Sequence, residues 1–505
     1  MYGLIPAPVS VEVSEGHCLI GCLPGFGYEK QFEPEVSVVA SWLAQQLPKT
    51  IPEEYRQADI ISINVYNDLV KGGTEAYKLF IRPTVIEIHV ASAAGVVRAG
   101  ATLAQLVSAH GCRLPCLSIE DQPRYSWRGF MLDTVRNFFS VDFILRQLDL
   151  AALHKLNMFH WHLSDDQAWR LDLEEMPELA AHGAQRLDRR FNVVKWKGGS
   201  YSAADVRRVV EFAASRHISV IPEIDVPGHS SALLASHPEL WCRSAHDDRH
   251  FLPEDRYGIF DAVLCAGRDE SLNLVGRVFS GLSGLFPGKY LHAGGDEVPK
   301  EQWLVCEHCR ARMRDEGLQD KHGNFDPERL QAWFMEQVQV GINGLGRTMV
   351  GWDELVDGGC SRDVLIMAWR STGHGAKAAE LGYKVVMCPQ NKACYLDHKH
   401  LDLEEEPGQL GICTVRDAYA FDPHPEGLSA AAAANILGGQ ANLWTELVYF
   451  GKQAEYMLYP RLSAIAEALW SPKAVRDFAS FASRLELHGR FLDRLQVNRY
   501  RGPLE

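Results

Sequence analysis

Two adjacent carboxylates give the clearest chemical signal in this sequence. Asp296 and Glu297 belong to the segment LHAGGDEV, in which an apolar start and two glycines precede the acids. Consecutive strand residues point to opposite faces, so the two side chains share one pocket only where the strand ends or bulges. Two carboxyl groups in one pocket are suited to general acid-base catalysis. An isolated Asp-Glu pair is more often a solvated strand end, so the neighbouring segments must decide between this interpretation and a catalytic pair.

Other segments that combine histidine with acids favour the chemical interpretation. The segment HWHLSDD contains His160 and Asp165, and the segment PEIDVPGH ends at His229. A buried charge must be paired or hydrogen-bonded. We therefore expect Asp165 to contact His229, with Glu297 close by, in an arrangement that also tunes a proton donor. His160 has a simpler interpretation as a hydrogen-bonded core residue.

Three tryptophans lie near the ends of apolar runs in the second half of the chain. These are Trp352, Trp369 and Trp444. Each alone is typical of a protein core. Together at one rim they predict an aromatic-walled pocket, suited to the apolar face of a sugar or to an acetamido methyl group.

The arrangement of apolar runs predicts the frame that brings these residues together. Eight runs are rich in Val, Ile, Leu and Met without polar alternation, as is typical of parallel strands buried on both faces. Eight such strands close a (β/α)8 TIM barrel, whose active site lies at the carboxyl ends of the strands. The predicted strands span residues 129–135, 158–164, 219–226, 290–297, 348–354, 364–370, 384–390 and 436–446.

The chain before the barrel follows a different pattern. Short β-like runs are followed by an alanine-rich helical stretch at 94–109, and proline-bearing segments then occur around Pro115 and Pro123. Prolines of this kind are typical of a boundary between units. We expect a small non-catalytic α/β domain over residues 1–122 and a catalytic (β/α)8 barrel over 123–505 that ends in a helical segment.

Composition excludes several kinds of partner. The chain has 65 acidic and 51 basic residues and a formal charge of -14, which repels phosphate backbones and anionic lipids. No apolar run approaches the roughly 18 residues of a membrane-spanning helix. We expect no nucleic acid partner and no membrane insertion. The start MYGLIPAPVSVEVSEG lacks the pattern of a secretory signal, and twelve dilute cysteines are typical of a reducing compartment, so a cytoplasmic location is expected.

One pair of cysteines suggests a metal site. Cys306 and Cys309 form a CxxC motif around His308. A structural zinc site usually needs a second pair of ligands, and none stands at convincing spacing. Free thiols are therefore the favoured interpretation, and we expect neither a metal nor another cofactor.

Taken in order, the motifs resemble those of the glycoside hydrolase family 20 β-N-acetylhexosaminidases. They run from DTVRNFF at residue 133 to GGQANLWTE at residue 446, with HAGGDE, GWDE and YLD between them. The region before the barrel also resembles the small non-catalytic domain of these enzymes. The family has a (β/α)8 barrel and needs no metal or cofactor.

The resemblance implies an exo-acting, retaining hydrolase that removes terminal non-reducing β-linked GlcNAc or GalNAc from a glycan or glycoconjugate. The acetamido oxygen of the substrate attacks the anomeric carbon and forms an oxazolinium ion. Glu297 is then the general acid and base, Asp296 orients the acetamido N–H, and Tyr395 donates a hydrogen bond to the acetamido oxygen. Asp165 and His229 support the acid/base.

The same resemblance implies that six further residues bind the sugar. Three tryptophans enclose the acetamido methyl group, and three polar residues hold the hydroxyl groups of the terminal ring. The first group is Trp352, Trp369 and Trp444, and the second is Arg136, Asp397 and Glu446.

Three alternatives stay open from the residues alone. A catalytically inactive carbohydrate-binding barrel would keep the tryptophans and Arg136 without needing a complete acid/base and its supporting histidine. A related enzyme that releases disaccharides or acts on chitin oligomers would share the terminal sugar pocket, because the leaving-group side is built from variable loops. A metal-dependent barrel hydrolase is suggested by His160 and His162, but no further ligand set accompanies them.

Overall fold

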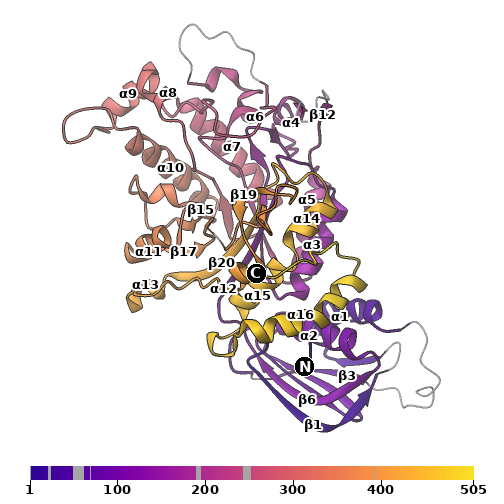
Figure 1. The fold of residues 1–505 in the computed structure, drawn as a ribbon. Helices are drawn as coiled ribbons and strands as arrows, with labels where there is room; N and C mark the ends of the chain where they lie inside the picture. Colours follow the sequence, from indigo (N-terminus) through magenta and orange to yellow (C-terminus); the bar gives the residue numbers. More distant parts are fainter. Residues whose placement is uncertain are drawn as a thin grey trace.

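A closed barrel of eight parallel strands forms the centre of the protein (Figure 1). The computed structural model describes residues 2–20, 24–48, 62–68, 70–188, 195–242, 252–391 and 393–505. The barrel strands are β7 (Trp127–Asp133), β8 (Met158–His162), β13 (Ser219–Glu223), β14 (Tyr290–His292), β15 (Thr348–Trp352), β16 (Leu365–Ala368), β17 (Lys384–Met387) and β20 (Ile436–Leu443). The predicted (β/α)8 TIM barrel is confirmed.

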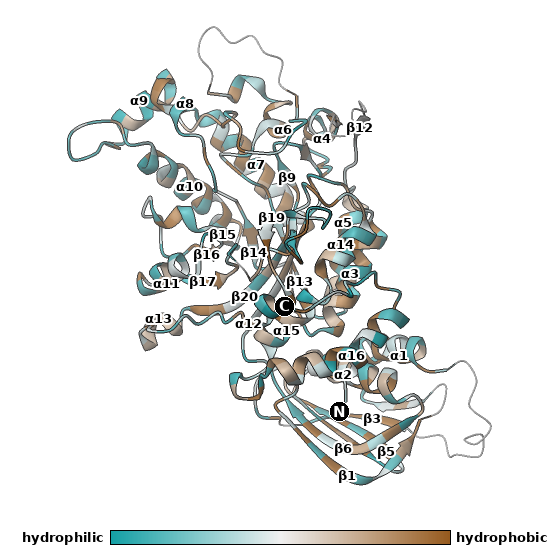
Figure 2. Ribbon diagram, in the orientation of Figure 1, coloured by the Kyte–Doolittle hydropathy of each residue, from teal (hydrophilic) through white to brown (hydrophobic). Residues whose placement is uncertain are grey.

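Helices surround the barrel and connect its strands (Figure 1). The longer ones are α3 (Val141–Leu153), α5 (Ala203–Ala214), α7 (Asp269–Leu285), α10 (Pro327–Gly344), α11 (Thr372–Glu380), α14 (Gly451–Leu458), α15 (Arg461–Trp470) and α16 (Phe478–Arg494). Hydrophilic and hydrophobic residues alternate along the outer helices (Figure 2), as expected for helices with one face on a core and one in water. No helix among the described residues is long and apolar enough to cross a membrane.

Shorter elements lie in the connections between barrel strands and helices. The helices are α4 (Pro177–Gly183), α6 (Ser231–Leu234), α8 (Glu301–Val305), α9 (Glu307–Asp315), α12 (Val415–Ala420) and α13 (Ala430–Ala433). The strands are β9 (Ser164–Asp165), β10 (Ala168–Trp169), β11 (Arg186–Asp188), β12 (Lys195–Lys197), β18 (His398–Lys399) and β19 (Gln409–Ile412). The elements that directly follow a barrel strand contribute to the rim at the carboxyl ends of the strands, whereas α13 directly precedes β20 and lies at their amino ends.

All eight predicted strands occur, but each ends earlier than predicted. The run predicted at 290–297 is a strand only as far as His292, and the run at 219–226 only as far as Glu223. The residues immediately beyond these points, 293–295 and 224–226, stay buried, so burial continues after the backbone has left the sheet. That departure turns the segments that follow toward the barrel mouth.

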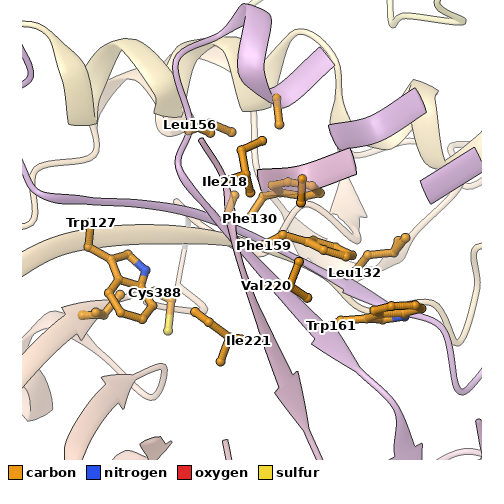
Figure 3. Close-up of a cluster of buried hydrophobic side chains, with 14 of the residues drawn as sticks. Trp127, Phe130, Leu132, Leu156, Phe159, Trp161, Ile218, Val220, Ile221 and Cys388 are labelled. Atoms are coloured by element: carbon orange, nitrogen blue, oxygen red, sulfur yellow. The ribbon is translucent and has the colours of Figure 1, made fainter. Parts of the chain in front are cut away.

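The barrel strands are buried on both faces. Val220 and Ile221 are neighbours in β13 and lie on opposite sides of the strand (Figure 3), and both are at most 5% exposed. Phe130 of β7 and Phe159 of β8 stack with ring centroids 4.9 Å apart. Side chains therefore fill both the barrel interior and the layer beneath the helices, which gives the rim a rigid base.

A six-stranded sheet precedes the barrel. Its strands, in spatial order, are β1 (Ser10–Leu19), β6 (Arg113–Asp121), β4 (Tyr77–Arg82), β5 (Val85–Val90), β3 (Ser62–Asn67) and β2 (Gly25–Tyr28). Helices α1 (Glu33–Gln46), α2 (Ala93–His110) and α16 lie between this sheet and the barrel (Figure 1). Residue 122 falls between β6 and β7, and the division of the chain there stays a prediction.

The alanine-rich sequence of α2 follows from its position. Ser92 caps its first turn by accepting a hydrogen bond from the Ala94 backbone N–H. The helix packs against the sheet, α1, α3 and α16, and nearly all of its residues are buried. A Cβ atom at Gly100 would lie 2.2 Å from a methyl carbon of Val39, so only glycine permits this approach of α1.

A buried ion pair joins the sheet to the barrel. Lys155 Nζ, just after α3, lies 2.7 Å from Asp121 Oδ2 at the end of β6, and both side chains are at most 1% exposed. The hydroxyl of Tyr77 and the indole N–H of Trp470 also donate to this carboxylate, at 2.8 and 2.9 Å. The backbone N–H groups of Val9 and Gln122 donate to it as well, and a fully buried charge depends on such partners.

We therefore expect Lys155→Met to destabilise the protein by about 3 to 5 kcal/mol, because Asp121 is left with an uncompensated buried charge. Urea unfolding followed by circular dichroism measures this change. Lys377→Met is the control, since Lys377 is 59% exposed and its ion pair with Asp357 is worth at most about 1 kcal/mol. Equal losses in the two variants would contradict the role of the buried pair.

Candidate active site

A cavity of about 270 Å³ opens at the carboxyl ends of the barrel strands. Ten of the eleven predicted site residues line it, and the eleventh, Asp165, lies beneath. The predicted lining residues are Arg136, His229, Asp296, Glu297, Trp352, Trp369, Tyr395, Asp397, Trp444 and Glu446. The lining residues that were not predicted are Gln390, His398, Gln409 and Gly411.

The adjacent acids face one cavity because the chain leaves the sheet before them. Backbone φ angles are +66° at Gly294, +99° at Gly295 and +49° at Glu297. Glycine is required at the first position, where a Cβ atom would lie 1.7 Å from Asp225 Oδ1. The left-handed conformation of Glu297 is costly for a residue with a side chain, and such strain is typical of functional sites.

Asp165 links Arg136 in the cavity wall to His229, which lies next to Glu297. One of its oxygens lies 2.7 Å from a guanidinium nitrogen of Arg136 and 3.0 Å from His162 Nε2. The other lies 3.2 Å from His229 Nδ1, as the sequence predicts, and His229 Nε2 lies 3.5 Å from Glu297 Oε2. The sequence analysis did not anticipate the contacts with Arg136 and His162.

The charges in this chain of contacts stabilise one another. Burial alone would raise the pKa of Asp165, but the charges of Arg136 and His229 hold it well below its usual value. Burial alone would lower the pKa of His229, but Asp165 and its hydrogen bonds hold it well above its usual value. The imidazole is therefore cationic and donates a hydrogen bond toward Glu297.

Asp296 forms a carboxyl pair with Asp225. The two side chains hydrogen-bond to each other, and Asp225 Oδ1 also accepts from the Gly295 backbone N–H at 3.1 Å. Burial raises the pKa of Asp296 to about 7, and burial together with the Asp296 charge raises that of Asp225 well above its usual value. Asp225 is thus the protonated member of the pair. Its carboxyl group donates a hydrogen bond to the Asp296 carboxylate, which faces the cavity.

Aromatic rings enclose the space in front of Asp296. The rings of Trp352 and Trp444 lie 6.1 Å apart, and those of Trp369 and Tyr395 stack at 6.3 Å. The indole N–H of Trp369 donates to Glu354 at 3.0 Å, and that of Trp444 donates to the Tyr395 hydroxyl. With these N–H groups bonded, the rings present apolar faces to the cavity and Tyr395 keeps its own proton to donate.

A group of ionisable residues also lines the cavity. Arg136 lies 5.1 Å from the ring centroid of Trp444, and Asp397 and Glu446 line the same cavity. Burial, with the nearby Glu446 charge, raises the pKa of Asp397 well above its usual range. Burial also raises the pKa of Glu446, although the Arg136 charge opposes this. Such dry polar groups are suited to the hydroxyl groups of a sugar.

The sequence analysis assigned no role to the buried Glu223. Its carboxylate lies 3.0 Å from both His160 Nε2 and His292 Nδ1, contacts His162 Nδ1, and accepts from the Trp352 indole N–H at 2.9 Å. Burial alone would raise the pKa of Glu223, but the histidines hold it well below its usual value. His160 is a core residue, as expected, and both histidines of the HWH motif contact this carboxylate. Glu223 lies within an apolar strand, so only the three-dimensional clustering reveals its role.

A (β/α)8 barrel with two carboxyl groups and an aromatic, polar-ended pocket at the carboxyl ends of its strands defines a glycoside hydrolase. The sequence model of the glycosyl hydrolase family 20 catalytic domain matches residues 125–473, and that of domain 2 of the same family matches residues 1–122. The chain belongs to glycosyl hydrolase family 20.

Relatives with known names agree with this assignment. A β-hexosaminidase of Porphyromonas gingivalis is 40% identical over 74% of this chain, which spans 46% of that protein. A β-N-acetylhexosaminidase of Cellulomonas fimi is 32% identical over 99% of this chain and 96% of its own length. The solved exo-β-N-acetylglucosaminidase of Vibrio harveyi in complex with N-acetylglucosamine is 31% identical over 99% of this chain and 78% of its own, with a TM-score of 0.87.

The protonation of Asp225 predicts a pH effect on stability. A folded pKa above the unfolded value of about 3.9 means that the folded state holds this proton longer, so stability falls as pH rises above about 4, by up to about 1.4 kcal/mol per unit. Asp225→Asn keeps the hydrogen bonds but has no carboxyl proton to lose in the unfolded state. We therefore expect its free energy of unfolding to rise relative to that of the unchanged protein as the pH increases from 4 to 7. Urea unfolding across this range tests the point, with the exposed Asp363→Asn as the control. Parallel curves for Asp225→Asn and the unchanged protein would exclude a protonated Asp225.

Proposed function

We propose that the protein is an exo-acting, retaining β-N-acetylhexosaminidase that uses substrate-assisted catalysis. Its substrates are glycans or glycoconjugates that end in non-reducing β-linked GlcNAc or GalNAc. One observation carries the proposal: Asp296 Oδ1 is buried beside an aromatic enclosure and meets no donor among the described residues. A secondary amide N–H would supply the missing hydrogen-bond donor to Asp296 Oδ1, and a small apolar group next to the amide would fit the aromatic enclosure.

The names of the relatives support the same substrate class. Those of Porphyromonas gingivalis and Cellulomonas fimi are called a β-hexosaminidase and a β-N-acetylhexosaminidase, and the Vibrio harveyi enzyme was solved with N-acetylglucosamine. This chain spans about half of the Porphyromonas protein but nearly all of the Cellulomonas one. The match to nearly the whole of a relative named a β-N-acetylhexosaminidase supports the proposed activity.

Glu297 acts as the general acid. Its side chain is 35% exposed, so it reaches the open side of the cavity, where the leaving sugar lies. The Glu297 proton passes to the glycosidic oxygen as the bond between that oxygen and the anomeric carbon breaks. The His229 imidazolium, 3.5 Å away, then stabilises the carboxylate that results.

Asp296 and Tyr395 position the internal nucleophile. The acetamido oxygen forms a bond to the anomeric carbon from the side opposite to the leaving group, and the Tyr395 hydroxyl donates to this oxygen. The positive charge of the resulting oxazolinium ion is shared with the amide nitrogen, which the Asp296 carboxylate stabilises. Glu297 then takes a proton from water, which opens the oxazolinium ring at the anomeric carbon. Two inversions leave the β configuration unchanged.

The buried polar part of the cavity wall supports exo action. Arg136, Asp397 and Glu446 line the cavity, and we assign them to the hydroxyl groups of the terminal ring. A ring whose free hydroxyl groups are bound in this way is the last one of its chain. An inactive sugar-binding barrel would have no use for Glu297 in a strained backbone conformation above a cationic His229.

Replacing the acid tests its assignment. We expect Glu297→Gln to lower kcat on a natural disaccharide by about 10² to 10⁴, which is the usual contribution of general acid-base catalysis. The loss in the first step should be smaller for an aryl glycoside with a good leaving group, because that bond breaks with less protonation. Glu301→Gln, on the exposed surface of α8, is the control. Near-normal turnover of the disaccharide by Glu297→Gln would rule the assignment out.

The choice of substrates tests the proposed nucleophile. We expect hydrolysis of aryl β-GlcNAc and β-GalNAc and negligible hydrolysis of the matched β-glucoside, which lacks the acetamido group. A cyclic thiazoline mimic of the intermediate should bind about 10² or more times better than substrate. Steady-state kinetics measure both effects. Comparable rates on the glucoside would show that the protein does not depend on the acetamido oxygen.

A further inference from the structure

Four cysteines from separate parts of the chain meet beside α9. They are Cys242, Cys265, Cys306 and Cys309, and their sulfur atoms all lie within 4.8 Å of one another. All four are buried, three of them almost completely. The sequence-based view that the CxxC pair lacks a second pair of ligands is wrong, because the second pair comes from two positions without recognisable spacing.

Three sulfur–sulfur distances in the cluster are near the edge length of a metal-centred tetrahedron. Sulfur atoms are 3.3 Å apart for Cys242 and Cys309, 3.6 Å for Cys265 and Cys309, and 3.7 Å for Cys265 and Cys306. Four thiolates around one Zn²⁺ at about 2.3 Å have edges of about 3.8 Å. A disulfide brings two sulfurs to about 2.05 Å and gives no reason for four to converge.

The local backbone is arranged to present sulfur atoms as thiolates. Cys306 is the N-cap of α9, and the backbone N–H of Cys309 donates a hydrogen bond to the Cys306 sulfur. A helix N-terminus favours negative charge, which lowers the cost of a thiolate there. A Cβ atom at Gly267 would lie 2.2 Å from the backbone of His308, so glycine permits the approach that brings Cys265 to α9.

We propose that these four cysteines bind one Zn²⁺ in a structural site. Four thiolates complete the coordination of zinc and leave no position for water or substrate, so the ion has no part in hydrolysis. Soft sulfur ligands in tetrahedral arrangement select zinc over harder divalent ions such as Mg²⁺ or Ca²⁺.

The site holds together the two rim segments that carry His229 and Glu297. Next to Cys265, the Leu264 backbone N–H donates to the carbonyl of Pro227 at 2.9 Å, two residues before His229. The carbonyl of Leu264 accepts from the indole N–H of Trp303 at 3.1 Å, in the segment that follows Glu297. The ion would therefore act as a cross-link between the loops that follow β13 and β14.

Metal analysis of the purified full-length protein tests the proposal directly and does not depend on its activity. We expect about one zinc per chain, with X-ray absorption showing four sulfur neighbours at about 2.3 Å. Iron in place of zinc, nitrogen or oxygen in the first shell, or no zinc bound or taken up would each overturn it. So would disulfides among these cysteines, found by mass spectrometry after alkylation without reductant.

A pair of variants separates metal binding from the general effect of losing a buried cysteine. We expect Cys265→Ser to lower the zinc content at least about tenfold and the Tm by at least about 5 °C. Cys360→Ser removes a buried cysteine outside the cluster and should keep its zinc. A chelator should lower the Tm of the unchanged protein, and added Zn²⁺ should restore it. Full zinc content in Cys265→Ser would overturn the ligand assignment even if both variants lose stability.

Discussion

The buried negative charge of Asp165 is the constraint on which the active site depends. Its carboxylate is 2% exposed and forms ion pairs with Arg136, His162 and His229, which come from three different segments of the barrel rim. Removing one partner from such a cluster typically costs about 3 to 5 kcal/mol, so the three segments stay in register. His229 is thereby held next to Glu297, and Arg136 is held in the cavity wall.

The same arrangement, in which one buried acid is bonded by donors from separate elements, occurs elsewhere in the protein. Glu223 gathers three histidines and the indole N–H of Trp352 inside the barrel, which fixes one wall of the pocket. Asp121 gathers a lysine, a tyrosine and a tryptophan where the sheet meets the barrel. In each case one buried acid accepts from donors on separate elements, and the cost of leaving it unpaired fixes their relative positions. The proposed zinc site would add a cross-link of the same kind made of sulfur.

The sequence predicts the barrel and most of the pocket because both depend on local patterns. Apolar runs identify all eight strands, and short motifs contain nine of the ten predicted residues that line the cavity, the exception being Trp369. Strand ends are missed because the chain leaves the sheet at His292 but stays buried through residues 293–295, as a strand of the barrel would. Glu223 and the pair of Cys242 and Cys265 are missed for another reason. Their partners are distant in sequence, and only the closed fold brings them together.

The stereochemistry of hydrolysis tests the central claim most directly, because it reports which atom attacks the anomeric carbon. Proton NMR of the sugar released in the first moments of reaction distinguishes the two anomers before they interconvert. Attack by the acetamido oxygen, enclosed by Asp296, Tyr395 and the tryptophans, predicts β-GlcNAc as the first product. An initial α anomer would mean that water attacks directly, and it would contradict the account.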